Sequence, residues 1–132
     1  RGSFVVPTGF DWHLLVGDET ALPAISRRLE ELPEGARVLV VAQTADAADR
    51  RGFGGRALAE VRWVRADAAD ALAREVAALT LPAGEGFAWA AGEAASMAAV
   101  RQALLQGHGL DKARVRASAY WKRGSAGHHE TL

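Results

Sequence analysis

The sequence contains no cysteine among its 132 residues. This absence excludes disulfide bonds, thiolate metal sites, iron–sulfur ligation and a cysteine nucleophile, and it is compatible with a reducing cytoplasm, where we expect the protein to be located. Sixteen Lys and Arg balance sixteen Asp and Glu, so the chain has no net field to attract nucleic acid or an anionic membrane. Any anion site must be local, and we expect no nucleic-acid or membrane partner.

Long hydrophobic runs are also missing. No apolar stretch approaches the roughly 20 residues that cross a bilayer, and residues 1–4 lack the apolar character of a signal peptide. The length and the 49% hydrophobic content suit one compact domain over residues 1–132. The chain begins without Met, in a segment that resembles the inside of a longer polypeptide, so we expect it to be a fragment.

The apolar residues that are present fall into short runs and helical stripes. Buried strands are predicted at residues 12–16, 37–42, 61–64, 87–91 and 115–120. Helices are predicted after Thr20, which we expect to cap the first, and at residues 68–79 and 94–106. This alternation predicts an α/β fold with a parallel sheet covered by helices on both faces. We expect residues 121–132 to form a surface tail.

Ligands of such sheets bind beyond the carboxyl ends of the strands. The turn of Gly17, Asp18, Glu19 and Thr20 follows the first strand, where the pyrophosphate of a dinucleotide would meet backbone donors at a helix N-terminus. The G-x-G-x-x-G fingerprint is absent, and Asp18 and Glu19 place negative charge there. These acids also suit a second interpretation, in which they stabilise the helix dipole.

Gly92 and Glu93 follow the fourth strand in the same way. A glycine at this position lets a ligand approach the backbone closely. A glycine followed by an acid is also the ordinary start of a helix, so a structural interpretation stays open.

The segment after the fifth strand is more distinctive, because Lys122 and Arg123 follow Tyr120 and Trp121. Two cations beside two aromatic rings suit a flat, anionic ligand. The alternative is a strand end with solvated basic residues.

Other chemistry has little support. His128, His129 and Glu130 are sequence neighbours, which seldom converge on one metal ion, so we expect no metal site. No serine lies in a G-x-S-x-G motif, which removes support for hydrolase chemistry. Arg50 and Arg51 are interpreted as solvated residues, or as a contact for the 2′-phosphate of NADP.

Three motifs, in order and spacing, resemble the C-terminal domain of siderophore-interacting proteins, which belong to the ferredoxin-reductase superfamily. The likeness covers almost the whole chain. The motifs are Asp11-Trp12-His13-Leu14-Leu15-Val16-Gly17-Asp18-Glu19-Thr20-Ala21-Leu22-Pro23-Ala24-Ile25, Trp89-Ala90-Ala91-Gly92-Glu93 and Tyr120-Trp121-Lys122-Arg123-Gly124.

The resemblance implies a three-layer α/β/α sandwich with strand order 3-2-1-4-5. It also implies a flavin-dependent ferric-siderophore reductase, in which an N-terminal β-barrel holds FAD and this domain receives NADH or NADPH. On this basis we expect the cofactor to contact Gly17, Asp18, Glu19, Thr20, Gly92 and Glu93, and the ferric siderophore to contact Trp121, Lys122 and Arg123. The partners implied are the siderophore and the protein's own FAD domain.

The flavin barrel of the family uses an Arg-x-Tyr-Ser/Thr motif, whereas Trp121 follows the single tyrosine of this chain, Tyr120. We therefore expect no catalytic residue in this chain and no activity from it in isolation. The superfamily often has Cys-Gly where this sequence has Ala91-Gly92. Two other functions remain open, namely a non-catalytic module that binds ferric siderophore and an α/β domain that docks a protein partner.

Overall fold

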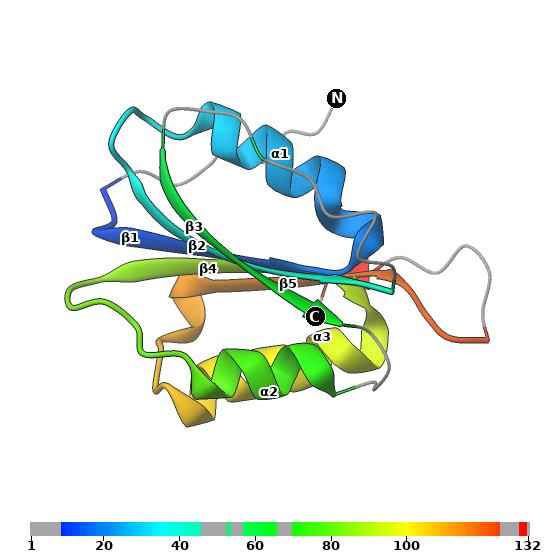
Figure 1. The fold of residues 1–132 in the computed structure, drawn as a ribbon. Coiled ribbons are helices and arrows are strands. Elements are labelled where there is room, and N and C mark those ends of the chain that lie inside the picture. The colour runs from blue at the N-terminus through cyan, green and yellow to red at the C-terminus, as the bar shows by residue number, and fades with distance from the viewer. Residues whose placement is uncertain (1–8, 46–52, 54–56, 66–69, 125–129, 132) are drawn as a thin grey trace.

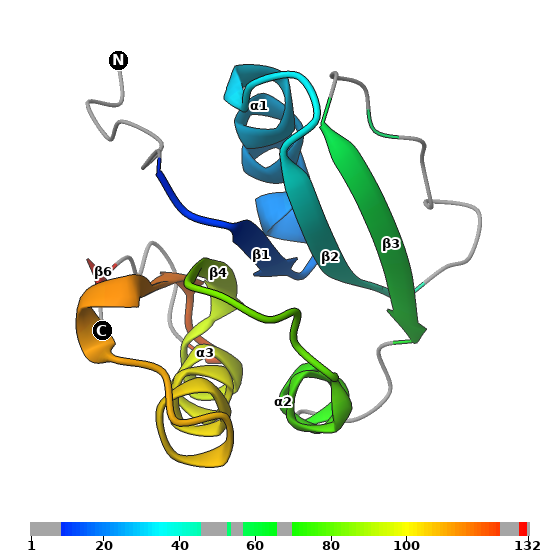
Figure 2. The same ribbon diagram turned by 90° about the vertical axis from the view of Figure 1, so that its left-hand side faces the viewer.

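The fold is an open, twisted sheet between two helical layers. A computed structural model describes residues 9–45, 53, 57–65, 70–124 and 130–131. Helix α1 covers one face of the sheet, and α2 and α3 cover the other (Figures 1 and 2). The helices are α1 (Leu22–Glu31), α2 (Ala71–Ala78) and α3 (Ala94–Gln102), and the strands are β1 (Trp12–Gly17), β2 (Arg37–Thr44), β3 (Leu58–Arg65), β4 (Gly86–Glu93), β5 (Val115–Trp121) and β6 (Glu130–Thr131).

The strand order is β3-β2-β1-β4-β5-β6. The first five strands of this order are parallel, which confirms the predicted fold class and the order 3-2-1-4-5. The sixth was not predicted: Glu130 and Thr131, within the expected tail, pair antiparallel with Ala119 and Ser118 of β5. An edge strand presents unpaired backbone groups, and β6 satisfies some of those on β5.

Two of the strands continue past the apolar runs that predict them. Strand β2 extends to Thr44 and β4 extends to Glu93, and both side chains are buried. The backbone ladder with neighbouring strands continues through these polar residues. Polar side chains are thereby placed at the carboxyl edge of the sheet.

Alternation along the strands divides the core between the two faces of the sheet. Trp12, Leu14 and Val16 pack with the apolar faces of α2 and α3. Leu15 points to the other face and packs with the α1 residues Leu22, Ile25 and Leu29, together with Trp89 of β4. Strands β1, β2 and β4 are buried on both faces, which explains why they appear in the sequence as continuous apolar runs.

The first helix begins differently from the prediction that Thr20 caps it, which was wrong. Asp18 is the cap of a short 3-10 turn, Glu19–Ala21, and its side chain accepts the backbone N–H of Thr20. Helix α1 follows directly from this turn and has no side-chain cap of its own. The carboxylate reaches the free amide two residues ahead, so Thr20 supplies a donor instead of an acceptor.

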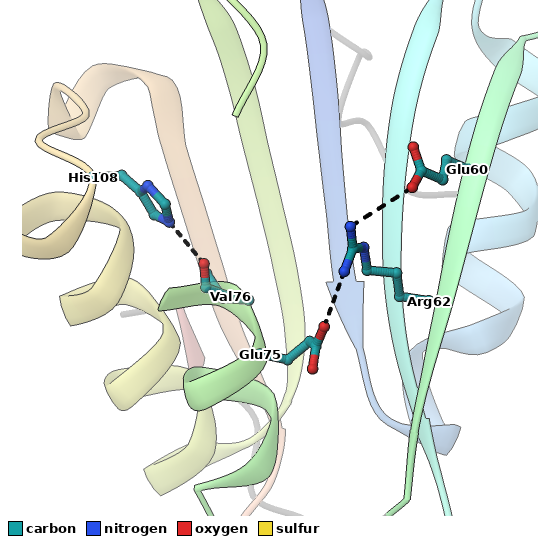
Figure 3. A network of polar contacts seen from close by, with 5 residues as sticks. All are labelled: Glu60, Arg62, Glu75, Val76 and His108. Carbon is teal, nitrogen blue, oxygen red and sulfur yellow. Dashed lines mark hydrogen bonds and ion pairs between the residues drawn. The ribbon is translucent and has the colours of Figure 1, made fainter. Parts of the chain in front are cut away.

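The predicted helix at residues 94–106 divides into α3 and a π-helical segment, Ala103–Gly107. Directly after it, Nε2 of His108 lies 2.7 Å from the carbonyl oxygen of Val76 in α2 (Figure 3). The same carbonyl also accepts the backbone N–H of Leu79 at 3.2 Å, so the His108 ring adds a second contact at the C-terminal end of α2. It joins the ends of the two helices on this face.

Figure 3 also shows Arg62 of β3 between Glu75 of α2 and Glu60 of its own strand, at 3.5 and 3.8 Å. These side chains are substantially exposed, so each ion pair contributes about 0–1 kcal/mol.

In the ranges that the structure describes, no helix is both long enough and apolar enough to cross a membrane.

Candidate functional site

The strand order places the candidate residues at one edge of the sheet. Strand β1 lies between β2 and β4, so the chain leaves β1 toward one side first and later returns to the other. This reversal is the switch point at which doubly wound sheets bind ligands. The carboxyl ends of β1, β4 and β5 meet there, and all three segments singled out in the sequence lie at these ends.

Asp18 connects the three segments through its carboxylate. Oδ1 accepts the backbone N–H of Thr20 at 3.0 Å and the Thr20 hydroxyl. Oδ2 accepts the backbone N–H of Glu93 at 3.0 Å and the indole Nε1–H of Trp121 at 2.9 Å. An ionised carboxylate has about four acceptor positions, so the protein itself uses the whole hydrogen-bonding capacity of Asp18.

The two glycines of the site are explained by close packing inside the protein. A Cβ atom at Gly17 would lie 2.6 Å from Cβ of Ala21 and 3.1 Å from the carbonyl oxygen of Ala91. A Cβ atom at Gly92 would lie 2.7 Å from Oδ2 of Asp18. Both distances require a shift of the neighbour, so glycine is needed here whether or not a ligand binds.

Glu93 is buried and caps helix α3. Its Oε1 accepts the backbone N–H of Ser96 at 2.9 Å, and its Oε2 lies 3.4 Å from the backbone nitrogen of Arg123. Burial works to raise the pKa of Glu93, but hydrogen bonds from the backbone of Ser96, Ala95 and Arg123, with the charge of Arg123, outweigh it and lower the pKa. Glu93 is therefore an anion near neutral pH.

The residues predicted to contact the siderophore are one member of this network, Trp121, and the two residues that follow it in the sequence. The side chain of Trp121 is half-buried, and Lys122 and Arg123 are exposed. The guanidinium carbon of Arg123 lies 5.5 Å from the centroid of the Trp121 ring, within cation–π range. Lys122 and Arg123 therefore present positive charge to solvent beside an aromatic ring.

The two aromatic rings of this segment do not form one stacking surface. Trp121 faces Asp18, whereas Tyr120 meets the edge of Trp89 at a centroid distance of 6.5 Å. A register shift between Gly92 and Glu93 places Trp121 opposite Glu93 and leaves Tyr120 out of the ladder. Such a bulge redirects the side chains that follow it.

Sequence reasoning missed two polar contributors. The hydroxyl of Thr44, at the end of β2, donates to Oε2 of Glu19 at 3.1 Å. The signal available in the sequence was the polar pair Gln43-Thr44 directly after an apolar run. Together, Asp18 and Glu19 bind the turn after β1 to the ends of three neighbouring strands.

The second missed residue is Arg28 of α1, whose guanidinium carbon lies 4.4 Å from the centroid of Trp89. Burial, as the main cause, lowers its pKa to about 10, so Arg28 stays cationic near neutral pH. Only the packing of α1 on β4 brings Arg28 to an aromatic ring, so no local pattern in the sequence indicates this contact.

The chemistry available at this edge is recognition by charge, ring faces and hydrogen-bond acceptors. The amides of Thr20 and Glu93, which could otherwise bind a phosphate, already donate to Asp18. Where residues are described, no three His, Asp or Glu side chains are grouped as metal ligands. Arg50, Arg51, His128 and His129, which the sequence raised for NADP or metal, lie outside the described residues.

Comparison with known proteins gives a consistent result. The family model described as siderophore-interacting protein matches residues 10–124. The ferric vibriobactin reductase of Vibrio cholerae is 33% identical over 119 residues, which are 86% of this chain and 44% of that protein. An NADPH-dependent ferric-chelate reductase of Escherichia coli is 32% identical over 124 residues, 92% of this chain and 48% of that protein.

A solved structure of a siderophore utilization protein from T. fusca is similar with a TM-score of 0.81 and 36% identity. The similarity covers 92% of this chain and 48% of that protein. This chain thus spans about half the length of the curated relatives that it matches.

Proposed function

Because this chain belongs to the siderophore-interacting protein family, we propose that it is the C-terminal domain of an NAD(P)H-dependent, FAD-containing ferric-siderophore reductase that acts in iron acquisition. The full-length protein, in this proposal, is this chain together with an N-terminal segment that binds FAD. Flavin supplies the conversion between a two-electron hydride donor and a one-electron ferric acceptor. Ferrous iron is the weaker Lewis acid for hard oxygen donors, so reduction releases it from the siderophore. A cytoplasmic location is part of the proposal.

The position of Arg123 is the observation that supports this function most. Its guanidinium lies over the Trp121 ring, and its backbone N–H faces the carboxylate of Glu93. These contacts hold Arg123 in place, while its guanidinium is exposed at the switch-point edge. A positioned, exposed cation suits an anionic ferric siderophore. Lys122 is adjacent and also exposed, and we assign it the same role.

For the dinucleotide we propose a site across Gly17 to Thr20 and Gly92 to Glu93. The switch-point location supports it. An exposed carboxylate at this site fits the hydroxyl and amide groups of the ligand better than its phosphates, because a carboxylate accepts hydrogen bonds from a ribose hydroxyl and repels a phosphate. Glu19, which is exposed, is the candidate for a ribose contact.

A non-catalytic siderophore-binding module is the second candidate. The occupied amides of Thr20 and Glu93 favour it, since they are not free to bind a pyrophosphate. Titration of the full-length protein with NADH and NADPH separates the two candidates. Reduction of bound flavin by either dinucleotide supports the reductase, and its absence supports the binding module.

The test of the proposed function compares this chain with the full-length protein. Reduction of a ferric tris-catecholate siderophore by NAD(P)H is followed with a chromophoric Fe(II) chelator. We expect the full-length protein to be yellow and active, and this chain to be colourless and inactive. A preparation of this chain that holds stoichiometric flavin would contradict the proposed division between the two segments.

A further inference from the structure

The switch point of this chain already contains an anion, the carboxylate of Asp18. Its two oxygens accept four hydrogen bonds from three segments, with donors in Thr20, Glu93 and Trp121. Glu93 and Trp121 are 75 and 103 positions away along the chain. The carboxylate of Asp18 thus accepts the hydrogen bonds that the phosphate of a ligand could otherwise accept. It also joins the ends of β1, β4 and β5.

The surrounding backbone is shaped for this contact. Gly92 has no side chain, and a Cβ atom there would lie 2.7 Å from Oδ2 of Asp18. The register shift after Gly92 sets Trp121 opposite Glu93, so that the indole N–H and the Glu93 amide reach the same oxygen. A glycine and a bulge are both needed to bring these donors together.

The contact continues to Arg123. Trp121 donates to Asp18 at one edge of its ring, and its face lies 5.5 Å from the guanidinium carbon of Arg123. The hydrogen bond to Asp18 therefore sets the plane on which the guanidinium rests. Asp18 does not itself contact Arg123 in any described interaction, so its effect on this cation passes through the indole.

We propose that Asp18 is a positioning residue for substrate binding, which fixes the indole of Trp121 and thereby orients the guanidinium of Arg123. The inference rests on the proposed function, in which Arg123 meets an anionic ferric siderophore. It assigns to Asp18 a role other than direct contact with the dinucleotide. An ordered cation loses less conformational entropy on binding than a mobile one, so losing the hydrogen bond weakens affinity.

Two substitutions remove the contact from opposite ends. Trp121→Phe keeps an aromatic ring beneath the guanidinium and removes only the indole N–H. Asp18→Asn keeps the shape of the side chain but has one acceptor oxygen, so two of the four donors then face an NH2 group. Trp63→Phe is the matched control, because Trp63 is a half-buried indole that stacks on Phe53 and lies on β3, four strands along the sheet from Trp121 on β5.

The measurement is the dissociation constant of a ferric tris-catecholate for the full-length protein, with Arg123→Ala as the reference for loss of the cation. We expect Trp121→Phe and Asp18→Asn each to weaken binding about two- to tenfold, the range that corresponds to the net contribution of one hydrogen bond. We expect the double variant to be no weaker than Asp18→Asn, because both changes remove the same bond. Trp63→Phe retains the wild-type affinity.

A second readout separates positioning from general destabilisation. In 1H–15N spectra of this chain, the indole N–H of Trp121 is expected to exchange slowly with solvent, and Asp18→Asn is expected to speed that exchange. Because a neutral ferric tris-hydroxamate gains little from a cation, Trp121→Phe should weaken its binding less than binding of the catecholate, whereas an unfolded site would lose both ligands to the same extent.

The outcomes distinguish this inference from the function on which it rests. If Arg123→Ala weakens catecholate binding but Trp121→Phe and Asp18→Asn do not, the positioning role is wrong and the proposed function stands. If Arg123→Ala has no effect either, the proposed substrate site is wrong and the inference fails with it.

Discussion

Nε1 of Trp121 lies 2.9 Å from Oδ2 of Asp18, although 103 positions separate the two residues. The same oxygen accepts the backbone N–H of Glu93. One carboxylate therefore closes the edge of the sheet where the candidate site lies. The predictions below test the packing that permits this contact and the charges around it.

Gly92→Ala is expected to destabilise the chain by about 1–3 kcal/mol, the usual cost of forcing an extra carbon into a packed site. The new Cβ would lie 2.7 Å from Oδ2 of Asp18, so the carboxylate must move away from its donors. Urea unfolding gives the free energy, and the Trp121 indole resonance reports the contact. Gly107→Ala is the control, because its Cβ has nothing within 4 Å. Equal stability of the two variants would contradict the packing argument.

Gly86→Ala, at the amino end of β4, is expected to lower the free energy of unfolding at least as much as Gly92→Ala does at the carboxyl end. Its Cβ would overlap the ring of Trp12, whose indole is almost fully buried. The ring cannot swing into solvent, so we expect a loss of about 1–3 kcal/mol or more in the free energy of unfolding. Thermal unfolding followed by circular dichroism measures it against the same Gly107→Ala control. A melting temperature within a degree or so of wild type would mean that the ring can relocate.

The stability of the chain should fall as the pH is lowered below about 6.5, because of His13. Burial lowers the pKa of His13 from its ordinary value of 6.5. The unfolded chain thus takes up a proton before the folded chain does, which favours unfolding as the pH falls. Urea midpoints between pH 7 and pH 5 test this, and His13→Val should remove that part of the pH dependence. If the urea midpoint of His13→Val depends on pH as steeply as that of wild type, His13 is not the source of the pH dependence.

Glu93 should add a second loss of stability at more acid pH. Hydrogen bonds from the backbone outweigh burial and hold its pKa below the ordinary value of 4.5. Its contribution is therefore fully present above about pH 4.5 and is lost as the pH falls through the lower folded pKa. Glu93→Gln, which keeps the shape of the cap, should flatten the pH dependence in that range. A profile in Glu93→Gln that parallels wild type would contradict this.

Replacing both Lys122 and Arg123 with Ala in the full-length protein should weaken binding of an anionic ferric catecholate by about 1–3 kcal/mol at low salt. Both side chains are exposed, so salt should screen the interaction and reduce the difference. Isothermal titration at two salt concentrations measures the effect. Turnover with a neutral electron acceptor should stay near wild type. An equal loss of catecholate affinity and of turnover with the neutral acceptor would indicate a role in domain docking instead.

The fold could be predicted from local patterns. The runs Leu14–Val16 and Val38–Val41 are apolar because their strands are buried on both faces, and the stripe through Leu22, Ile25 and Leu29 is apolar because it faces the sheet. Each pattern depends only on which residues of one short segment are buried, so it is visible without knowledge of the rest of the chain. The predicted strand ends also placed the three candidate segments correctly at one edge.

The sequence by itself determined the strands, the helices and the residue types at that edge, since backbone periodicity and burial act over a few positions. Only the tertiary structure decided what Asp18 contacts and how Trp121 and Tyr120 diverge. It also decided that residues 130–131 join β5. Apart from the Asp18–Thr20 contact, these outcomes depend on groups 11 to 103 positions apart. A carboxylate binds whichever donors the fold brings within about 3 Å, and no local pattern specifies those donors.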